Sequence, residues 1–484
     1  MQLEIATGFY QSDSLPLVAQ RCVNWEPVVP QASALNQRAL FDVHGIDTRS
    51  LTGATINGQN RGAQVVNNVP YFINGTNLYS IDSSNVVTDH GTVVGSGRVS
   101  LANNGQFLVI VVPGITGYAF DNADTTLTEI TSINFQVADT VSFKDGFFIF
   151  TSSDGEQFFI SNLNQPLVFS ALDFGSAEVR PDKIVATHVN HNELFVAGRD
   201  IFELFQNIGG SGFPFQRVRG GDIQKGLHAK FSLIDFDNSF VFLGGDVNEL
   251  TAVWRVGAGV QKLSTSAIDN AIQEYTEDEI ADAFAMTYAH GGNFFVAFTF
   301  TSTRIPSKTF VYDATTSALT GEKVWHERQS GIADDKWRIT SIVSAFSELL
   351  VGDSIDGRIG TLNKDTHTEY GEVIKRQKTS TPFNSDQFPI FVSELKLTME
   401  SGLGNITGDA TDPKILMEFS NDGARTFKPA GVRSYGKIGQ YQKLPSWRRQ
   451  GRIPRNRVLR FTTTEPIKSV IIRLDGEFSV SQTL

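Results

Sequence analysis

Residues 147–160 read FFIFTSSDGEQFFI, two apolar segments separated by a polar stretch that contains Asp154-Gly155. Asp and Gly tolerate positive φ, so this stretch favours a β-hairpin turn. The same pattern, a Phe- and Val-rich strand, a polar turn and a second apolar strand, occurs seven times between residues 71 and 363. The first strands begin, at spacings of 36 to 55 residues, at Tyr71, Phe107, Phe147, Leu194, Phe240, Phe294 and Leu349.

A repeat of this length built from short strands is typical of β-propeller blades, which must stack on their neighbours to bury both faces. The nearly continuous apolar runs agree, because they suit strands covered on both sides. We therefore expect an all-β protein whose main domain is a β-propeller of about seven blades. Six and eight blades stay open, since the first unit is short and residues 37–58 could supply a closing strand.

One passage, residues 264–289, interrupts the repeat between the fifth and sixth units. Its apolar side chains fall mostly at helical spacing, and Thr276-Glu277-Asp278-Glu279 has the pattern of a capping box. We predict two short inserted helices here, as packing elements that also offer a natural subunit contact. The apolar positions on which the prediction depends are Ile268, Ile272, Ile280, Phe284 and Met286.

The chain has an acidic first part and a basic last part. Residues 370–484 carry 18 Lys and Arg against 11 Asp and Glu, whereas residues 1–369 carry 23 against 41. The last part also contains alternating apolar and polar strands, such as residues 391–397, that are typical of a small antiparallel sandwich. The expected domains are an N-terminal arm and propeller-closing segment at 1–58, a β-propeller at 59–368 and a basic C-terminal β-sandwich-like domain at 369–484.

A search for catalytic, cofactor and metal motifs yields no candidate residue. His188 and His191 are the only close histidine pair and lack a third ligand nearby, and no phosphate-binding loop or nucleophile elbow is present. A single cysteine, Cys22, excludes an internal disulfide and fits a buried apolar position. No segment approaches the roughly 18 apolar residues of a membrane span, so we expect a soluble protein made in the cytosol without membrane insertion.

One turn suggests a glycan-related alternative. Residues 420–427, SNDGARTF, resemble the Asp-box of sialidase-type propellers, but the pattern occurs once and outside the repeats. A structural hairpin is therefore favoured over a glycosidase site, which would also need two carboxylates roughly 5–10 Å apart.

The strongest local signal is an arginine-rich segment at residues 447–460, with six arginines and no lysine. Arginine favours bidentate recognition of carboxylates or phosphates. Both docking onto an acidic protein surface and contact with DNA phosphates fit, and the acidic remainder of the chain favours the first. The candidate assembly residues are Trp447, Arg448, Arg449, Arg452, Arg455 and Arg457.

Four further segments occur in a recognisable order. They are residues 96–100 (SGRVS), 275–279 (YTEDE), 310–314 (FVYDA) followed by Trp325, and 447–452 (WRRQGR). In this order they resemble a known family, the packaged-DNA stabilisation proteins of short-tailed bacteriophages, tail accessory factors that form the hub or nozzle below the portal and adaptor rings.

The resemblance implies a non-enzymatic virion protein of the tail, assembled in the host cytoplasm as a hexamer beneath the adaptor ring. Such a ring would extend the DNA channel, close it after packaging and dock tail fibres, spikes or a needle, with double-stranded DNA passing transiently through its lumen. The alternatives are a carbohydrate-binding or glycan-cleaving propeller of a tail fibre and a cytosolic scaffold of the host. A glycan array with a hydrolysis assay distinguishes the tail-ring function from the first alternative. The identity of the neighbouring genes distinguishes it from the second.

Overall fold

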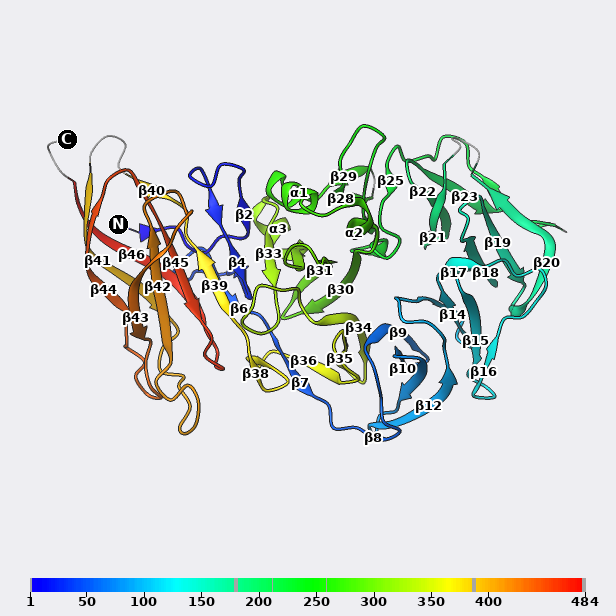
Figure 1. Cartoon of the computed structure of the whole chain (residues 1–484), viewed down its shortest axis with the longest axis horizontal. Helices are drawn as coiled ribbons and strands as arrows, with labels where there is room; N and C mark the ends of the chain where they lie inside the picture. The colour runs from blue at the N-terminus through cyan, green and yellow to red at the C-terminus, as the bar shows by residue number, and fades with distance from the viewer. Residues whose placement is uncertain (1, 178–181, 211, 258, 385–388, 481–484) are drawn as a thin grey trace.

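The computed structural model describes residues 2–177, 182–210, 212–257, 259–384 and 389–480. Its strands form a propeller that is joined at one side to a β-sandwich, and the sandwich and the third blade lie at opposite ends of an elongated molecule (Figure 1). The predicted all-β class, the propeller of about seven blades, the short helical insertion and the C-terminal sandwich are confirmed.

Seven propeller blades lie in the part of the chain that the structure describes, each an antiparallel sheet of consecutive strands. The first blade comprises β9 (Asn60–Val66), β10 (Val69–Asn74), β11 (Asn77–Ile81) and β12 (Val86–Thr92), with β8 (Thr52–Gly53) parallel to β12. The second comprises β13 (Ser100–Asn103), β14 (Phe107–Val112), β15 (Thr116–Asp121) and β16 (Thr126–Glu129). The third comprises β17 (Ala138–Lys144), β18 (Phe147–Ser152), β19 (Gln157–Asn162) and β20 (Gln165–Ser176).

The remaining blades follow the same plan. The fourth comprises β21 (Ile184–Asn190), β22 (Glu193–Gly198), β23 (Phe202–Asn207) and β24 (Phe215–Arg217), and the fifth β25 (Gly226–Leu227), β26 (Ile234–Asp235), β27 (Phe240–Gly245), β28 (Ala252–Val256) and β29 (Val260–Lys262). The sixth comprises β30 (Phe284–His290), β31 (Asn293–Phe300), β32 (Lys308–Asp313) and β33 (Trp325–Arg328), and the seventh β34 (Ile339–Ala345), β35 (Glu348–Asp353) and β36 (Ile359–Asn363).

The strands that start each sequence repeat are the second strands of the blades. Phe148 and Phe150 of β18, for example, are fully buried between neighbouring blades. An additional strand precedes each of them and lines the central channel, as β17 does in the third blade. These inner strands mix polar and apolar residues, because one of their faces meets the channel.

The seventh blade is completed from the N-terminal part of the chain. β7 (Gly45–Thr48) pairs antiparallel with β36, and Ile46 lies opposite Leu362. The sheet continues through β37 (Thr368–Glu369) and β38 (Glu372–Val373). The propeller is therefore closed by a pairing between residues more than 300 positions apart.

The insertion contains α1 (Ser266–Gln273) and α2 (Glu277–Ala281). Thr276 and Glu279 form the predicted capping box, since each side chain bonds the other's backbone N–H. The prediction extended too far, because Phe284 and Met286 lie in the inner strand β30 and face the core of the sixth and seventh blades. A further short helix, α3 (Ala314–Thr320), was not predicted.

The C-terminal domain is a sandwich of two sheets that also takes in N-terminal strands. One sheet has the order β44 (Ser446–Ile453), β41 (Ile390–Met399), β46 (Ile471–Val480), β6 (Ala39–Asp42), β5 (Trp25–Val28), with β1 (Gln2–Leu3) beside β46. The other has the order β4 (Cys22–Val23), β39 (Arg376–Thr379), β45 (Asn456–Thr463), β42 (Lys414–Ser420), β43 (Lys428–Ser434), with β40 (Phe383–Asn384) beside β45.

The second sheet also connects the two domains, because β33 of the sixth blade pairs with β4. A hairpin of β2 (Tyr10–Gln11) and β3 (Ala19–Gln20) lies over the junction next to α1. The sandwich core holds Trp25, Trp447 and the buried thiol Cys22. No helix among the described residues has the length and apolar character needed to cross a membrane.

Candidate assembly surface and central channel

The arginine-rich segment comprises β44, the edge strand of one sheet of the sandwich, the turn after it, and part of β45 in the other sheet. Trp447 and Ile453, near the two ends of β44, lie in the core, and the Trp447 Nε1–H donates to the Gly431 carbonyl at 2.8 Å. The exposed arginines of this segment are Arg448, Arg449, Arg452 and Arg455. The edge strand β44 therefore presents three guanidinium groups to solvent, and the turn that follows it presents the fourth.

Arg457, in contrast, is only 2% exposed. Its guanidinium donates to Asn421 Oδ1 at 2.8 Å and to the Gln450 carbonyl at 2.7 Å, and it lies 4.4 Å from the Phe419 ring centroid. Arg457 and Trp447 thus anchor the arginine-rich segment in the sandwich, and the prediction that they contact a partner needs correction. The burial arises because both side chains project inward from their strands.

Arg449 lies in a β-bulge. Val392 pairs with Gly451 and Glu394 with Arg448, so Arg449 and Gln450 together oppose one residue of β41. Arg449 has φ 54°, a left-handed conformation that costs a non-glycine residue roughly 1 kcal/mol or more. Bulges re-aim side chains, and strain of this kind is concentrated at functional sites. Charges and bulges on an edge strand also prevent unwanted strand pairing, which is the structural alternative.

Only one of the four exposed arginines has an acidic partner among the described residues. The Arg448 Nε–H donates to Glu394 at 3.0 Å, and hydrogen bonds from Lys396 and Arg448 lower the pKa of the Glu394 carboxyl. This pair is 78% exposed on the arginine side and contributes little to stability. The other three, Arg449, Arg452 and Arg455, have no acidic partner within the described residues.

The Asp-box-like turn is a hairpin loop between β42 and β43. Asp422 Oδ1 accepts hydrogen bonds from the backbone N–H groups of Arg425 and Thr426, at 3.1 and 3.0 Å. These bonds and the bond from Ser420 hold the pKa of Asp422 well below its usual range. The carboxylate therefore organises its own turn, at the sandwich and away from the propeller channel.

The histidine pair is placed in and beside a turn of the fourth blade. His188 Nε2 lies 3.1 Å from Asp235, and His191 Nε2 lies 2.9 Å from Asn238 Oδ1. Within the described ranges, no group of three His, Cys, Asp or Glu side chains is placed to hold a metal ion.

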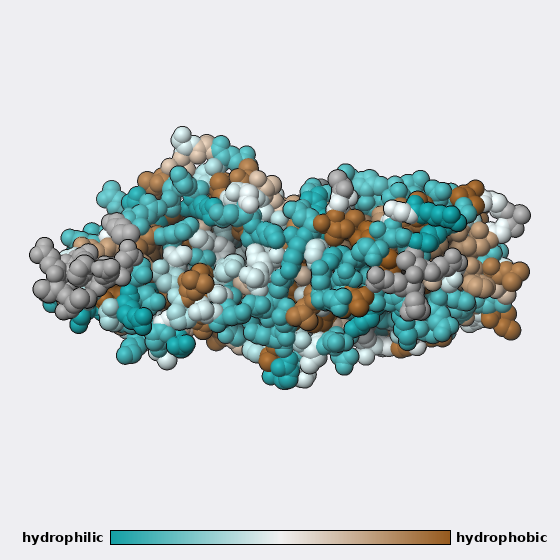
Figure 2. Space-filling view, turned by 90° about the horizontal axis from the view of Figure 1, so that it is seen from above, coloured by the Kyte–Doolittle hydropathy of each residue, from teal (hydrophilic) through white to brown (hydrophobic). Residues whose placement is uncertain are grey.

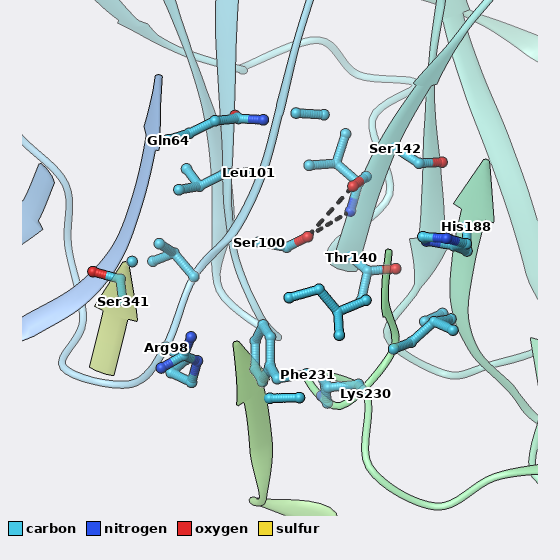
Figure 3. A pocket seen from close by; sticks show the side chains of 18 of the residues that line it. Gln64, Arg98, Ser100, Leu101, Thr140, Ser142, His188, Lys230, Phe231 and Ser341 are labelled. Atoms are coloured by element: carbon cyan, nitrogen blue, oxygen red, sulfur yellow. Dashed lines mark hydrogen bonds between the residues drawn. The ribbon is translucent and has the colours of Figure 1, made fainter. Parts of the chain in front are cut away.

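The centre of the propeller contains a cavity of about 460 Å³ lined by segments of all seven blades. Ser100, Thr140, Ser142, His188 and Ser341 supply polar groups around its wall (Figure 3). Most of these hydroxyls are already bonded within the wall, as Ser100 Oγ is by accepting from the Val141 N–H at 3.0 Å. The size is that of a small-molecule pocket.

The sequence analysis did not identify two cationic residues of this cavity, Lys230 and Arg98, as candidate site residues. Lys230 Nζ lies 2.5 Å from Asp139 Oδ2. Arg98 lies at one end of the cavity beside Phe231 (Figure 3). Arg98 belongs to the segment SGRVS that contributed to the family resemblance, and this was the only signal in the sequence that could have singled it out.

The fold is that of a β-propeller protein with a fused β-sandwich, and one edge strand of the sandwich is basic. A family model described as "Bacteriophage P22 Gp10, beta-propeller" matches residues 1–367, and one described as "Bacteriophage P22 Gp10, beta-sandwich" matches residues 377–478. The chain belongs to the bacteriophage P22 Gp10 family, a family of structural proteins of short phage tails. The predicted family relationship is confirmed.

No curated protein matches the chain at a significant level. Among solved structures, the chain is similar to the crystal structure of the computationally designed Ika8 protein, with 14% identity, a TM-score of 0.38, and 71% of this chain and 100% of that chain covered. It is also similar to the structure of U3-55K, with 11% identity, a TM-score of 0.36, and coverages of 66% and 98%. At this sequence identity and TM-score, the similarities give no information about function.

Proposed function

We propose that this chain is a hexameric, non-catalytic ring subunit of a short phage tail, assembled in the host cytoplasm. The ring lies below the portal and adaptor, extends and closes the DNA channel, retains the packaged genome and docks fibres, spikes or a needle. The observation that carries the proposal is the pair of family matches, which cover the propeller and the sandwich in order.

The small central cavity of the propeller supports a DNA path that runs between the subunits of a ring and not through each propeller. Its central cavity of about 460 Å³ has the volume of a small-ligand site and is too small to conduct a duplex. A ring of several copies would supply the lumen instead. The acidic balance of residues 1–369 suits such a lumen, because a surface that does not neutralise phosphates lets the duplex slide.

The charge distribution supports contacts between copies. Arg449, Arg452 and Arg455 on the sandwich edge have no ion pair within the described chain. The helical insertion of the propeller exposes acidic side chains, including Glu277, Asp278 and Asp282. Docking the basic edge of one copy on the acidic propeller of the next is a head-to-tail contact, the type that closes into rings.

Native mass spectrometry and negative-stain microscopy of the purified chain with its adaptor protein test the proposal. We expect rings of six copies on the adaptor from the wild-type chain and soluble monomers from the triple variant Arg448→Ala, Arg449→Ala, Arg452→Ala. The control removes three exposed lysines from the same domain, Lys428, Lys437 and Lys443. Rings from the arginine variant, or loss of rings from the lysine variant, would contradict the proposed contact, and a wild-type chain that never joins the adaptor would contradict the function.

A further inference from the structure

The outer edge of the third blade is formed by β20, a strand of twelve residues. No strand within the described ranges pairs with β20 on the side away from β19. Eight of its twelve residues are exposed to solvent. An open sheet edge carries unpaired backbone N–H and C=O groups, which form a template for a further strand.

The other blades show how this chain normally protects such an edge. In the first, sixth and seventh blades a further strand lies on it, since β8 pairs with β12, β4 with β33 and β7 with β36. In the second, fourth and fifth blades the edge strands β16, β24 and β29 have three or four residues and include a charged one. Short edges and charged side chains both discourage pairing. Of the seven described blades, only the third has a long edge strand that no other described strand covers.

The side chains of β20 make this edge apolar. The strand contains one charged residue, Asp173, and no lysine or arginine. Leu172 is 80% exposed, and Leu167, Val168 and Phe174 are 37%, 44% and 40% exposed. Figure 2 shows apolar surface at the end of the molecule where Figure 1 places the third blade. Exposed apolar surface that is concentrated in this way marks an interaction site.

A bulge of four residues, 170–173, interrupts the pairing of β20 with β19. It carries the most exposed apolar side chain of the strand, so it adds apolar surface and little charge. One carbonyl next to it, that of Phe169, accepts from Asn134 Nδ2 at 3.0 Å. The extended segments on either side of the bulge, residues 165–168 and 174–176, remain for pairing with a further strand.

The charge of the blade favours one kind of strand at this edge. Residues 131–177 contain five Asp and Glu and one Lys. That lysine, Lys144, is buried and lies 3.0 Å from Asp145. A second copy of the chain would bring the same acidic blade against itself, and like charges oppose such a contact. A strand with basic side chains is attracted instead.

We propose that β20 is a docking edge for an extended, basic segment of another protein, which adds to the third blade as a fifth strand. Backbone hydrogen bonds supply the affinity, and the exposed Leu172 and Phe174 contact apolar side chains at alternate positions of the segment. The sandwich lies at the opposite end of the molecule, so its basic edge can join copies while β20 stays accessible (Figure 1). On the basis of the proposed function, the segment belongs to another protein of the tail.

Fluorescence anisotropy with labelled twelve-residue peptides tests this edge on the purified full chain, without the adaptor. A peptide of alternating valine and lysine is expected to bind. A peptide of alternating valine and glutamate, and the valine–lysine peptide with every backbone nitrogen methylated, should each bind more weakly by on the order of tenfold. The first control reverses the charge, and the second keeps the charge and removes the backbone donors.

Variants of the chain place the contact on β20. The double variant Leu172→Ser, Phe174→Ser should weaken binding of the valine–lysine peptide by on the order of fivefold, because it removes the apolar contacts. The matched control Leu319→Ser, Ile332→Ser removes two exposed apolar side chains outside the third blade and should bind as the wild-type chain does.

Hydrogen exchange locates the contact independently of the variants. The valine–lysine peptide should slow exchange within residues 165–176 by on the order of tenfold and leave β16 and β24 unchanged. Equal binding of the methylated peptide, protection only outside the third blade, or no binding at about 1 mM peptide would overturn the proposal. Dimers of the chain that the double variant abolishes would also overturn it, since a second copy would then occupy the edge. None of these measurements requires ring formation, so the docking edge and the ring function can fail separately.

Discussion

Ile46 in β7 lies opposite Leu362 in β36, and both side chains are buried between the sixth and seventh blades. This pairing joins the N-terminal segment to the end of the propeller, so the ring of blades is closed without a covalent link. Closure of this kind depends on how well four residues fit the edge of the seventh blade.

Gly45 is the residue of β7 that should tolerate substitution least. A Cβ at this position would lie 2.3 Å from the Thr368 carbonyl oxygen and 2.5 Å from that of Thr366. We expect Gly45→Ala to destabilise closure by on the order of 2 kcal/mol. Hydrogen exchange should then show faster exchange in β36, whereas Gly97→Ala, whose Cβ would meet nothing within 4 Å, should leave β36 protected. Equal protection in both variants would contradict the role given to β7.

Arg457 and Arg448 both belong to the arginine-rich segment but should differ in their effect on stability. Arg457→Ala removes three hydrogen bonds that a buried guanidinium donates, together with its packing, and should cost roughly 3 kcal/mol. Arg448→Ala, at an exposed position, should change the free energy of unfolding by less than about 0.5 kcal/mol. Urea denaturation followed by tryptophan fluorescence measures the free energy of unfolding of both variants. Similar losses of stability would contradict the assignment of Arg457 to the core and Arg448 to the surface.

Substitutions at the bulge residue Arg449 distinguish the effect of its backbone strain on stability from the effect of its charge on ring formation. Glycine adopts φ 54° without penalty, so Arg449→Gly should leave the sandwich equally stable or raise its stability by about 0.5–1 kcal/mol. Arg449→Ala keeps the strained conformation and should not stabilise. Both variants should weaken ring formation in native mass spectrometry. Rings at wild-type level in both would show that this guanidinium serves only to guard the strand edge.

Acid should destabilise the closing segment through two histidines whose rings are in contact. The rings of His44 and His290 lie 3.4 Å apart, and burial, His290, Arg328, His367 and Lys364 together lower the pKa of His44 to about 3. Burial and the same two cations, Arg328 and Lys364, also lower the pKa of His290.

A histidine with a lowered folded pKa contributes stability that is complete above its unfolded pKa of about 6.5 and is lost as the pH falls. We expect the free energy of unfolding to fall by up to about 1.4 kcal/mol per pH unit through His44 between pH 6 and 4, and His290 should steepen this fall. His290→Phe keeps an aromatic ring against His44 and should make the slope shallower. Parallel pH profiles for the variant and the wild-type chain would refute this account.

The second strands of the blades could be predicted because Phe148, Phe150 and their equivalents are covered on both faces and leave an unbroken apolar signal. The inner strands could not, since residues such as Thr140 and Ser142 face the channel and dilute that signal. Phe284 and Met286 fell at helical spacing by chance in a stretch too short to separate a period of 3.6 from one of 2.

The remaining features could not be predicted because they depend on pairing between residues far apart in the sequence. Nothing local in β4 to β6 shows that these N-terminal strands join a sandwich formed mainly by residues beyond 370. The exposed arginines of β44 followed from composition, whereas the burial of Arg457 depends on Asn421 and Gln450, which the fold brings together from separate segments.

Electron cryomicroscopy of virions that carry this chain tests the central claim most directly. The account predicts six copies of the joined propeller and sandwich in a ring directly below the portal and adaptor, with the arginine edge of β44 against the neighbouring copy. Density for this fold only at the tips of fibres, or its absence from the particle, would contradict the claim.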